Sequence, residues 1–125
     1  MNEQTTLTWR TRKGLHYESL ALQHLRRHGL RPVTRNYRCP PGEIDLVMLD
    51  REVLVFVEVR FRADSRHGHA LETIDHRKQQ KLLRAAQYFL LQHKQHAQSP
   101  CRFDVVGIDQ TAGQLQFRWH HNAFS

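Results

Sequence analysis

Two acidic residues face one another across a predicted β-hairpin. The segments Glu43 to Leu49 and Val53 to Phe61 are rich in Val, Ile, Leu and Phe, and a short polar segment joins them, which is typical of an antiparallel hairpin. If the turn has two residues, alternation of the side chains places Asp45 directly opposite Glu58. Their Cβ atoms would lie about 4.5–5.5 Å apart, and two negative charges at that distance repel unless a cation neutralises them.

A divalent cation is one way to neutralise that pair. Mg²⁺ takes oxygen ligands, commonly one or two carboxylates with waters and phosphate oxygens. In phosphodiester hydrolysis a metal ion acidifies a water and offsets charge on the phosphate, and a cation such as Arg60 can stabilise the transition state. The alternative is an internal salt-bridge ladder that joins Asp45, Glu58 and Arg60 to Glu43, without a metal. A three-residue turn would instead pair Asp45 with Val57 and weaken the metal interpretation.

A third carboxylate interrupts the apolar stripe of a predicted helix. Leu15, Leu22 and Leu25 recur at helical spacing, and Glu18 falls within the same stripe. A carboxylate that faces a core is costly to bury unless it is hydrogen-bonded, paired or bound to a metal. Glu18 could equally lie at the edge of the stripe near the helix N-terminus, where a negative charge suits the helix dipole. The helical pattern alone does not separate these alternatives.

The elements that must position these residues alternate between helical and strand patterns. Apolar periodicity predicts one helix from Leu15 to His28, closed by Gly29, and a second from a cap at Thr73 or Asp75 to about His96. The remaining patterns predict five strands: Leu30 to Arg38, Glu43 to Leu49, Val53 to Phe61, Arg102 to Ile108 and Gln114 to Trp119. The order α-β-β-β-α-β-β indicates an α/β fold with a central mixed sheet flanked by helices.

Both faces of the predicted hairpin are substantially apolar. One face carries Ile44, Leu46 and Met48, and the other carries Asp45 and Val47. A hairpin of this kind is expected to be central to the sheet and covered on both sides. The charged residues at its open end are therefore not ordinary surface residues.

Length and composition exclude several classes of protein. The chain has 125 residues, 39% of them hydrophobic, which suffices for one modest core and excludes a two-domain enzyme. Its longest apolar run, Val53 to Val57, is far shorter than the ~20 residues of a membrane-spanning helix, and no secretory signal precedes it. Cys39 and Cys101 lack the paired spacing of a zinc site. We expect a cytoplasmic protein with a flexible basic N-terminus over residues 1–13 and a single domain over residues 14–125.

The charge distribution favours a nucleic-acid partner. The net charge is +7, with +6 in residues 1–38, −4 in residues 39–75 and +5 in residues 76–125. Basic flanks attract a polyanion, whereas an acidic centre repels phosphates unless a cation lies between them. The basic residues expected to contact DNA phosphates are Arg12, Lys13, Arg77, Lys78, Lys81 and Arg84. Each could also belong to an ordinary solvated surface. Because no aromatic residues interleave with them, duplex or branched DNA fits better than single strands.

An ordered series of motifs resembles a known family. The series comprises Gly14 with Glu18, Arg35-Asn36, Gly42-Glu43-Ile44-Asp45-Leu46, Phe56-Val57-Glu58-Val59-Arg60, Lys78-Gln79, Arg102-Phe103-Asp104-Val105 and Asn122-Ala123-Phe124. It is similar to the YraN-like family of bacterial proteins, which are predicted endonucleases of the restriction-endonuclease-like PD-(D/E)XK superfamily. The resemblance spans residues 14–124 and implies a restriction-endonuclease-like fold.

The resemblance also implies a function and roles for particular residues. It implies Asp45, Glu58 and Glu18 as ligands of Mg²⁺ or Mn²⁺, and Arg60 in the place of the motif's lysine as the fourth catalytic residue. The implied activity is a metal-dependent DNA endonuclease, selective for branched or junction DNA, and a homodimer is compatible with that analogy. Because Arg cannot act as a base, the alternative is a weak or inactive nucleic-acid-binding module of the same fold. Asp104 lies in one motif, where a structural and a catalytic role remain open.

Overall fold

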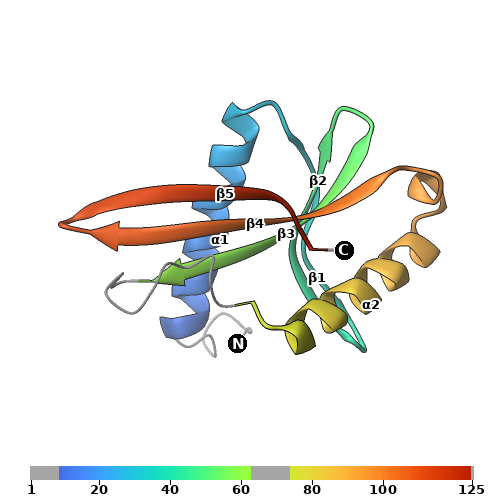
Figure 1. The fold of residues 1–125 in the computed structure, drawn as a ribbon, viewed down its shortest axis with the longest axis horizontal. Coiled ribbons are helices and arrows are strands. Elements are labelled where there is room, and N and C mark those ends of the chain that lie inside the picture. Colours follow the sequence, from blue (N-terminus) through green and yellow to red (C-terminus); the bar gives the residue numbers. More distant parts are fainter. Residues whose placement is uncertain (1–8, 63–73, 125) are drawn as a thin grey trace, which may run out of the picture.

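A five-stranded β-sheet runs through the centre of the structure, and one helix packs on each of its faces (Figure 1). The structure is a computed structural model that describes residues 9–62 and 74–124, with side chains from residue 14 onward. Residues 1–8, 63–73 and 125 lie outside the described part. The elements are α1 (Trp9–Arg27), β1 (Arg31–Cys39), β2 (Gly42–Asp50), β3 (Val53–Arg62), α2 (His76–Gln92), a 3₁₀ turn (Lys94–His96), β4 (Cys101–Thr111) and β5 (Gln114–Phe124).

The sheet is mixed, as predicted. Its strand order is β1-β2-β3-β4-β5, with β3 and β4 parallel and the other neighbours antiparallel. Helix α2 provides the crossover between β3 and β4 that a parallel pair requires. The predicted α/β class and element order are thus confirmed, and the arrangement is consistent with a restriction-endonuclease-like fold.

Two hydrophobic clusters hold the helices against the sheet. On one face, Ala21 and Leu25 of α1 pack with Leu46, Met48 and other apolar residues of the sheet. On the opposite face, four residues of α2 pack against the sheet: Leu82, Ala85, Ala86 and Phe89. Because apolar residues of β2 and β3 lie in both clusters, the hairpin is covered on both sides as its sequence predicts.

Helix α1 begins at Trp9, well before the predicted start at Leu15. The apolar stripe from which the helix was predicted begins only at Leu15. The helix therefore includes residues 9–13 of the expected flexible segment 1–13, and residues 1–8 lie outside the described part. Its predicted closing residue is confirmed: Gly29 has a φ of 94°, and the Leu30 N–H donates to the Leu25 carbonyl at 3.1 Å.

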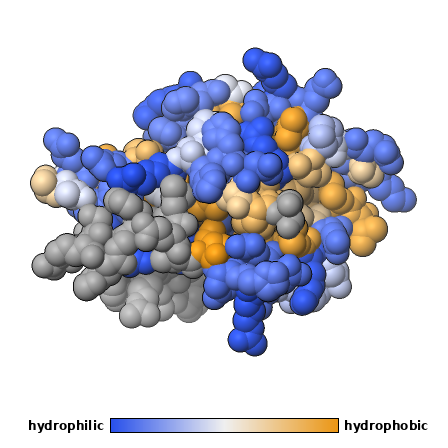
Figure 2. All heavy atoms as spheres, in the orientation of Figure 1, coloured by the Kyte–Doolittle hydropathy of each residue, from blue (hydrophilic) through white to orange (hydrophobic). Residues whose placement is uncertain are grey.

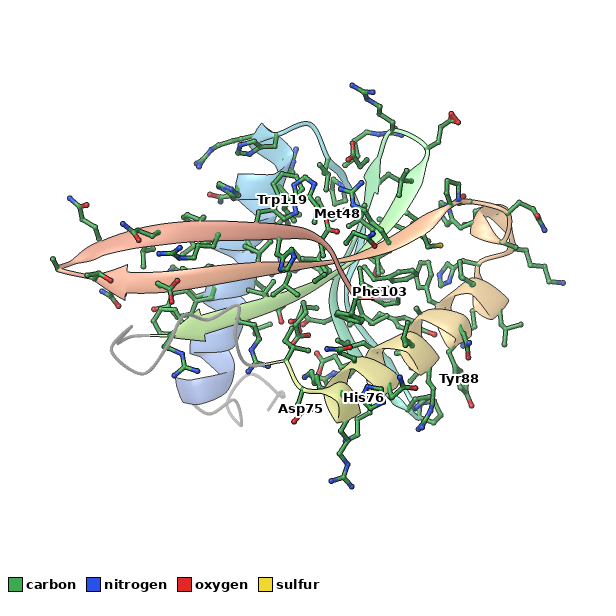
Figure 3. The ribbon with its side chains drawn as sticks, in the orientation of Figure 1. Met48, Asp75, His76, Tyr88, Phe103 and Trp119 are labelled. Carbon is green, nitrogen blue, oxygen red and sulfur yellow. The ribbon has the colours of Figure 1, made fainter. Side chains whose placement is uncertain are left out.

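Helix α2 begins after Asp75, one of its two predicted caps. The Asp75 carboxylate accepts the Lys78 backbone N–H at 2.8 Å, which satisfies a donor that the first helical turn leaves unpaired; Figure 3 shows Asp75 and His76 at this end. The other candidate, Thr73, lies outside the described residues. The helix ends at Gln92 instead of near His96, because the chain tightens there into a 3₁₀ turn.

The hairpin has the predicted register near its turn but opens before the acidic residues. Pairs run from Asp50 with Val53 to Leu46 with Val57, as a two-residue turn requires. The regular pairing ends there, because the Asp45 carboxylate accepts the backbone N–H of Val59 at 2.8 Å. Strict alternation fails at the same point.

Ile44 shows the consequence of this opening. It was predicted to share a face with Leu46 and Met48, but it lies in the cluster under α2 together with Val47. That prediction was wrong because it assumed continuous pleating through Asp45. The side-chain alternation is therefore interrupted between Ile44 and Leu46, although β2 itself continues from Gly42 to Asp50.

The surface of α2 changes character along its length. In Figure 2 hydrophilic residues cover its N-terminal half, and hydrophobic residues gather towards its C-terminal end, where Leu91 is 75% exposed. The exposed residues of the N-terminal half include Arg77, Lys81 and Arg84.

Among the described residues, no helix combines the length and apolar character needed to cross a membrane.

Candidate functional site

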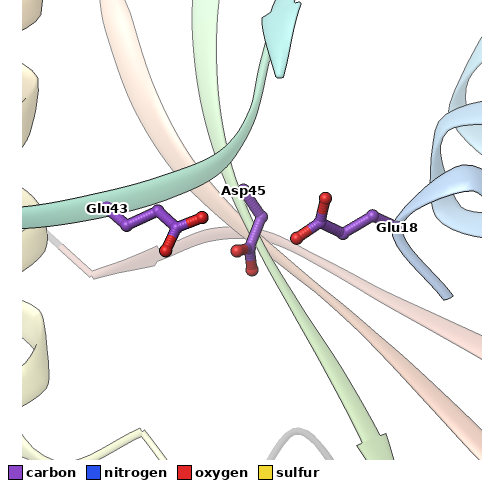
Figure 4. Close-up of side chains that lie close together, drawn as sticks. All are labelled: Glu18, Glu43 and Asp45. Atoms are coloured by element: carbon purple, nitrogen blue, oxygen red, sulfur yellow. The ribbon is translucent and has the colours of Figure 1, made fainter. Parts of the chain in front are cut away.

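Three carboxylates from two elements converge beside the open end of the hairpin. Glu18 comes from α1, and Glu43 and Asp45 come from β2. One oxygen of each lies within 4.8 Å of the other two. Figure 4 shows Asp45 between the other two side chains, which point towards it from opposite sides. This arrangement offers three hard oxygen ligands, the type that Mg²⁺ and Mn²⁺ prefer.

Glu18 belongs to the buried face of α1. It is 8% exposed, one turn before the fully buried Ala21, so it does not lie at a solvated edge of the helix. Two neighbouring residues of β1 contact this region. Asn36 hydrogen-bonds to the Glu18 carboxylate, and Arg35 donates to the Ser19 hydroxyl at 3.0 Å. Asn36 has a φ of 55°, a left-handed conformation that Asn tolerates better than most residues.

The Glu18 carboxylate lacks part of the hydrogen bonding that its burial demands. Its Oε1 is buried and has no hydrogen-bond partner among the described residues. Burial raises the pKa of Glu18, outweighing the hydrogen bond to Asp45 and the positive charge of Arg35. A buried carboxylate oxygen without a donor is costly. A proton or a metal ion would remove that cost.

Asp45 is a second carboxylate with an unfavourable environment for its negative charge. Burial raises its pKa to about 7, and the charge of Glu18 adds to this effect. The hydrogen bond from the Val59 N–H opposes the shift but does not cancel it. Asp45 thus lies between Glu18 and Glu43, and its carboxylate is fixed by the hydrogen bond from the Val59 N–H of β3.

Glu58 lies beside Asp45 but is paired with cations. It is 5% exposed, and its Oε2 lies 3.3 Å from Lys78 Nζ and 3.5 Å from Arg60 Nη1. Burial raises the pKa of Glu58 to about 7, the Asp45 charge raises it further, and Lys78 lowers it. Glu58 is thus close to the predicted site, yet the three-carboxylate group contains Glu43 in its place.

Glu43 is the member of the three-carboxylate group that was not predicted as a metal ligand. The sequence placed it only in the alternative salt-bridge ladder with Asp45, Glu58 and Arg60, but the hairpin pairing ends before Glu43. Its carboxylate instead lies 3.7 Å from Arg38 Nε, in an exposed ion pair. The spacing of Glu43 and Asp45, two residues apart on one strand, was the signal that could have identified it, because such residues share a face.

A cavity adjoins the carboxylates. It has a volume of about 260 Å³ and is lined by Glu43 and Asp45 from β2 and by Lys78 and Lys81 from α2. A larger open groove of about 710 Å³ lies along the N-terminal half of α2, and Lys81 lines it as well. Lys81 therefore lines both hollows.

The basic residues predicted to contact DNA divide into two groups. Arg77, Lys81 and Arg84 are exposed and line the open groove. Lys78 is partly buried and turns towards Glu58. Its position one turn before the buried Leu82 could have indicated this, since residues four apart share a helix face. The remaining two residues, Arg12 and Lys13, lie within α1, but their side chains are outside the described part.

Asp104, whose role the sequence left open, accepts hydrogen bonds from donors of its own strand and of β5. It is fully buried and accepts hydrogen bonds from Arg102 Nε at 3.0 Å, Trp119 Nε1 at 2.9 Å and the Asn122 N–H at 2.9 Å. Arg102 also lies 3.0 Å from Asp50. This network ties β5 and the hairpin turn to β4, and it leaves Asp104 no free ligand position.

Comparison with known proteins establishes the family. A family model described as "Uncharacterised protein family UPF0102" matches residues 17–108. The chain belongs to this family. It is the YraN-like family that the sequence motifs resemble, and the matched range contains Glu18, Asp45, Glu58 and Lys78.

Relatives match over most of their length. A UPF0102 protein from Stutzerimonas stutzeri is 54% identical over 107 residues, which cover 86% of this chain and 89% of the relative. A UPF0102 protein from Saccharophagus degradans is 51% identical over 112 residues, covering 90% and 92%. The chain thus corresponds to nearly the whole of these relatives.

Proposed function

We propose that this protein is a DNA endonuclease that uses Mg²⁺ or Mn²⁺ to hydrolyse phosphodiester bonds, with branched or junction DNA as its preferred substrate. The proposal is carried by the unpartnered Oε1 of Glu18, which is buried beside Asp45 and Glu43. An acidic cluster alone occurs on many surfaces without a metal. A buried carboxylate oxygen without a donor, within such a cluster, is a specific reason for a cation to bind there.

The donor set fits the expected ion. Glu18, Asp45 and Glu43 would hold it, since carboxylate oxygens suit Mg²⁺ and Mn²⁺ better than they suit softer metals. When bound, the ion would acidify a water and offset charge on the phosphate. The hydrogen bond from the Val59 N–H keeps the Asp45 carboxylate in place.

The surroundings of the carboxylates fit a phosphate backbone. Lys78 and Lys81 line the same cavity as Glu43 and Asp45, so positive and negative groups face one space. From Lys81 the open groove continues past Arg77 and Arg84. Contacts of this kind fix the position of a nucleic acid without reading its sequence, in keeping with selection by DNA shape.

A cleavage assay with matched variants tests the proposal. Linear, flapped and four-way DNA would be incubated with Mg²⁺ or Mn²⁺. We expect cleavage by the parent protein, a loss of at least about a hundredfold in Asp45→Asn, and parent-like cleavage in Glu52→Gln, which removes an exposed carboxylate of the hairpin turn. Undiminished cleavage in Asp45→Asn would assign the activity to another site or a contaminant.

One observation favours a second candidate function. Glu58 is held by both Lys78 and Arg60, and a site whose carboxylate is already neutralised suits a binding module that does not cleave. If the parent protein leaves all three DNA substrates intact while binding them in a salt-sensitive manner, the enzyme proposal is wrong and this alternative is favoured.

A further inference from the structure

A lysine of α2 lines the cavity beside the acidic site and also pairs with the neighbouring carboxylate of Glu58. Lys78 Nζ and Arg60 Nη1 lie within 3.5 Å of the same Glu58 oxygen, but their environments differ. The Lys78 side chain is 43% exposed and the Arg60 side chain 28%. Of these two residues, Lys78 lines the cavity that also contains Glu43 and Asp45.

We propose that Lys78 contacts the scissile phosphate during cleavage and that Glu58 acts as a positioning residue for Lys78. This inference rests on the proposed endonuclease function and deepens it. A phosphodiester that enters the cavity meets two carboxylates on β2, and a positive charge from α2 would offset their repulsion. An ammonium group has three donors, so one can remain on Glu58 while another reaches a phosphate oxygen.

The backbone of Lys78 is fixed by the fold. Its N–H donates to the capping carboxylate of Asp75 at 2.8 Å, and the next turn is anchored by Leu82, which is 4% exposed. The ion pair with Glu58 then restricts the long side chain. A charge held in advance at the place where negative charge develops stabilises a transition state more than a charge that must be brought there.

Glu58 has a matching role in this arrangement. Its carboxylate is 5% exposed and receives both Lys78 and Arg60. The three carboxylates that converge within 4.8 Å are Glu18, Glu43 and Asp45, which leaves Glu58 available to hold the lysine. Arg60, which does not line the cavity, also contacts the Glu58 carboxylate.

Steady-state cleavage with Mn²⁺ separates this role from a role in DNA affinity. We expect Lys78→Gln to lower kcat by about 10²–10³-fold while KM changes by less than about threefold. Lys78→Arg, which keeps a positive charge, should recover at least about tenfold of that loss. Arg84→Gln, on the open groove, should raise KM and leave kcat nearly unchanged. Lys94→Gln, an exposed lysine outside both hollows, serves as the matched control.

Metal binding measured by calorimetry supplies the readout that a structural role would not give. Lys78→Gln should bind Mn²⁺ as tightly as the parent protein or more tightly, because a nearby positive charge has been removed. The inference is overturned if Lys78→Gln retains the parent kcat, or if it loses Mn²⁺ binding together with activity. It is also overturned if Lys78→Arg recovers nothing while its thermal unfolding matches the parent's. Absence of cleavage by the parent protein would instead refute the proposed function itself.

Discussion

Two buried carboxylates in different regions of the molecule, Asp104 on β4 and Glu18 on α1, differ in the number of donors around them. Asp104 on β4 is fully buried and accepts hydrogen bonds from a guanidinium, an indole and a backbone N–H. Glu18 on α1 is 8% exposed, and its Oε1 has no partner among the described residues. Its neighbour Asp45 has a pKa raised to about 7, chiefly by burial.

The difference indicates two uses of the same chemical group. A carboxylate whose donors are supplied by the fold can hold strands together, and its charge is stabilised without any further ligand. Carboxylates that are buried together without enough donors oppose folding unless a proton or a cation joins them. Asp104 is therefore a structural residue, and the group around Asp45 is a candidate ligand site.

Removal of the Asp104 carboxylate is the strongest test of the structural half of this comparison. Asp104→Ala should lower the free energy of unfolding by about 3–5 kcal/mol, because it leaves Arg102 and the Trp119 N–H without their buried acceptor. Urea denaturation measures the loss. Mn²⁺ affinity of the folded variant should equal that of the parent protein. A loss below about 1 kcal/mol, or weakened Mn²⁺ binding, would break the distinction between the two regions.

The sequence predicted much of the fold because the relevant signals are local. Alternating apolar residues defined the hairpin and its register up to the pair of Leu46 and Val57, and Asp75 was one of two predicted caps of α2. The acidic end of the hairpin could not be predicted in the same way. Its geometry depends on Asp45 taking the backbone N–H of Val59 in place of a strand partner, which is a tertiary choice.

The roles within the site divide along the same line. Glu18 was identified as a candidate because a charge in an apolar stripe is conspicuous, and its burial is confirmed. Glu43 was named only in the alternative salt-bridge ladder, and Lys78 was grouped with the basic residues expected to contact DNA phosphates. Their actual neighbours come from different elements, namely Glu18 on α1 for the first and Glu58 on β3 for the second. Spacing within one element does not report such contacts.

The pH dependence of stability tests the ligand-site half of the comparison. Asp45 and Glu58 have pKa values of about 7 in the folded protein, above their ordinary values of 3.8 and 4.5. Between about pH 4.5 and pH 7 the folded protein binds more protons than the unfolded chain. The free energy of unfolding should therefore fall as pH rises through this range. We expect a fall of at least about 2 kcal/mol between pH 5 and pH 8 in chelator, measured by urea denaturation, because one such carboxylate alone contributes roughly that much.

Two controls isolate the carboxylates in that experiment. Saturating Mn²⁺ should reduce the fall, because the ion binds the deprotonated carboxylates and stabilises the folded state most at high pH. His24 acts in the opposite direction, since burial lowers its pKa and its protonation below about pH 6.5 favours the unfolded chain. The His24→Gln variant should therefore show a steeper fall than the parent protein. Stability that rises steadily from pH 5 to pH 8 in both proteins would contradict the raised pKa values.

The smallest expected effect is that of Glu18→Gln, and it tests whether Glu18 differs from Asp104. Glu18→Gln keeps the shape of the side chain but removes its charge and one ligand oxygen. Mn²⁺ affinity, measured by calorimetry, should fall by at least about tenfold. In chelator at pH 8 the free energy of unfolding should stay the same or rise, because the charge that is removed is one that burial disfavours.

The direction of the change in Mn²⁺ affinity and the direction of the change in stability together distinguish a metal ligand from a structural carboxylate. Asp104→Asn, the matched amide substitution, should lower stability and leave Mn²⁺ affinity unchanged, since Asp104 already has its donors. If Glu18→Gln also lowers stability and leaves Mn²⁺ affinity unchanged, Glu18 is held by its neighbours in the same way as Asp104. Its unpartnered oxygen would then be no sign of a metal. If the two variants instead differ in both stability and Mn²⁺ affinity as expected, burial alone does not define the role of a carboxylate. The number of hydrogen-bond donors around it then does.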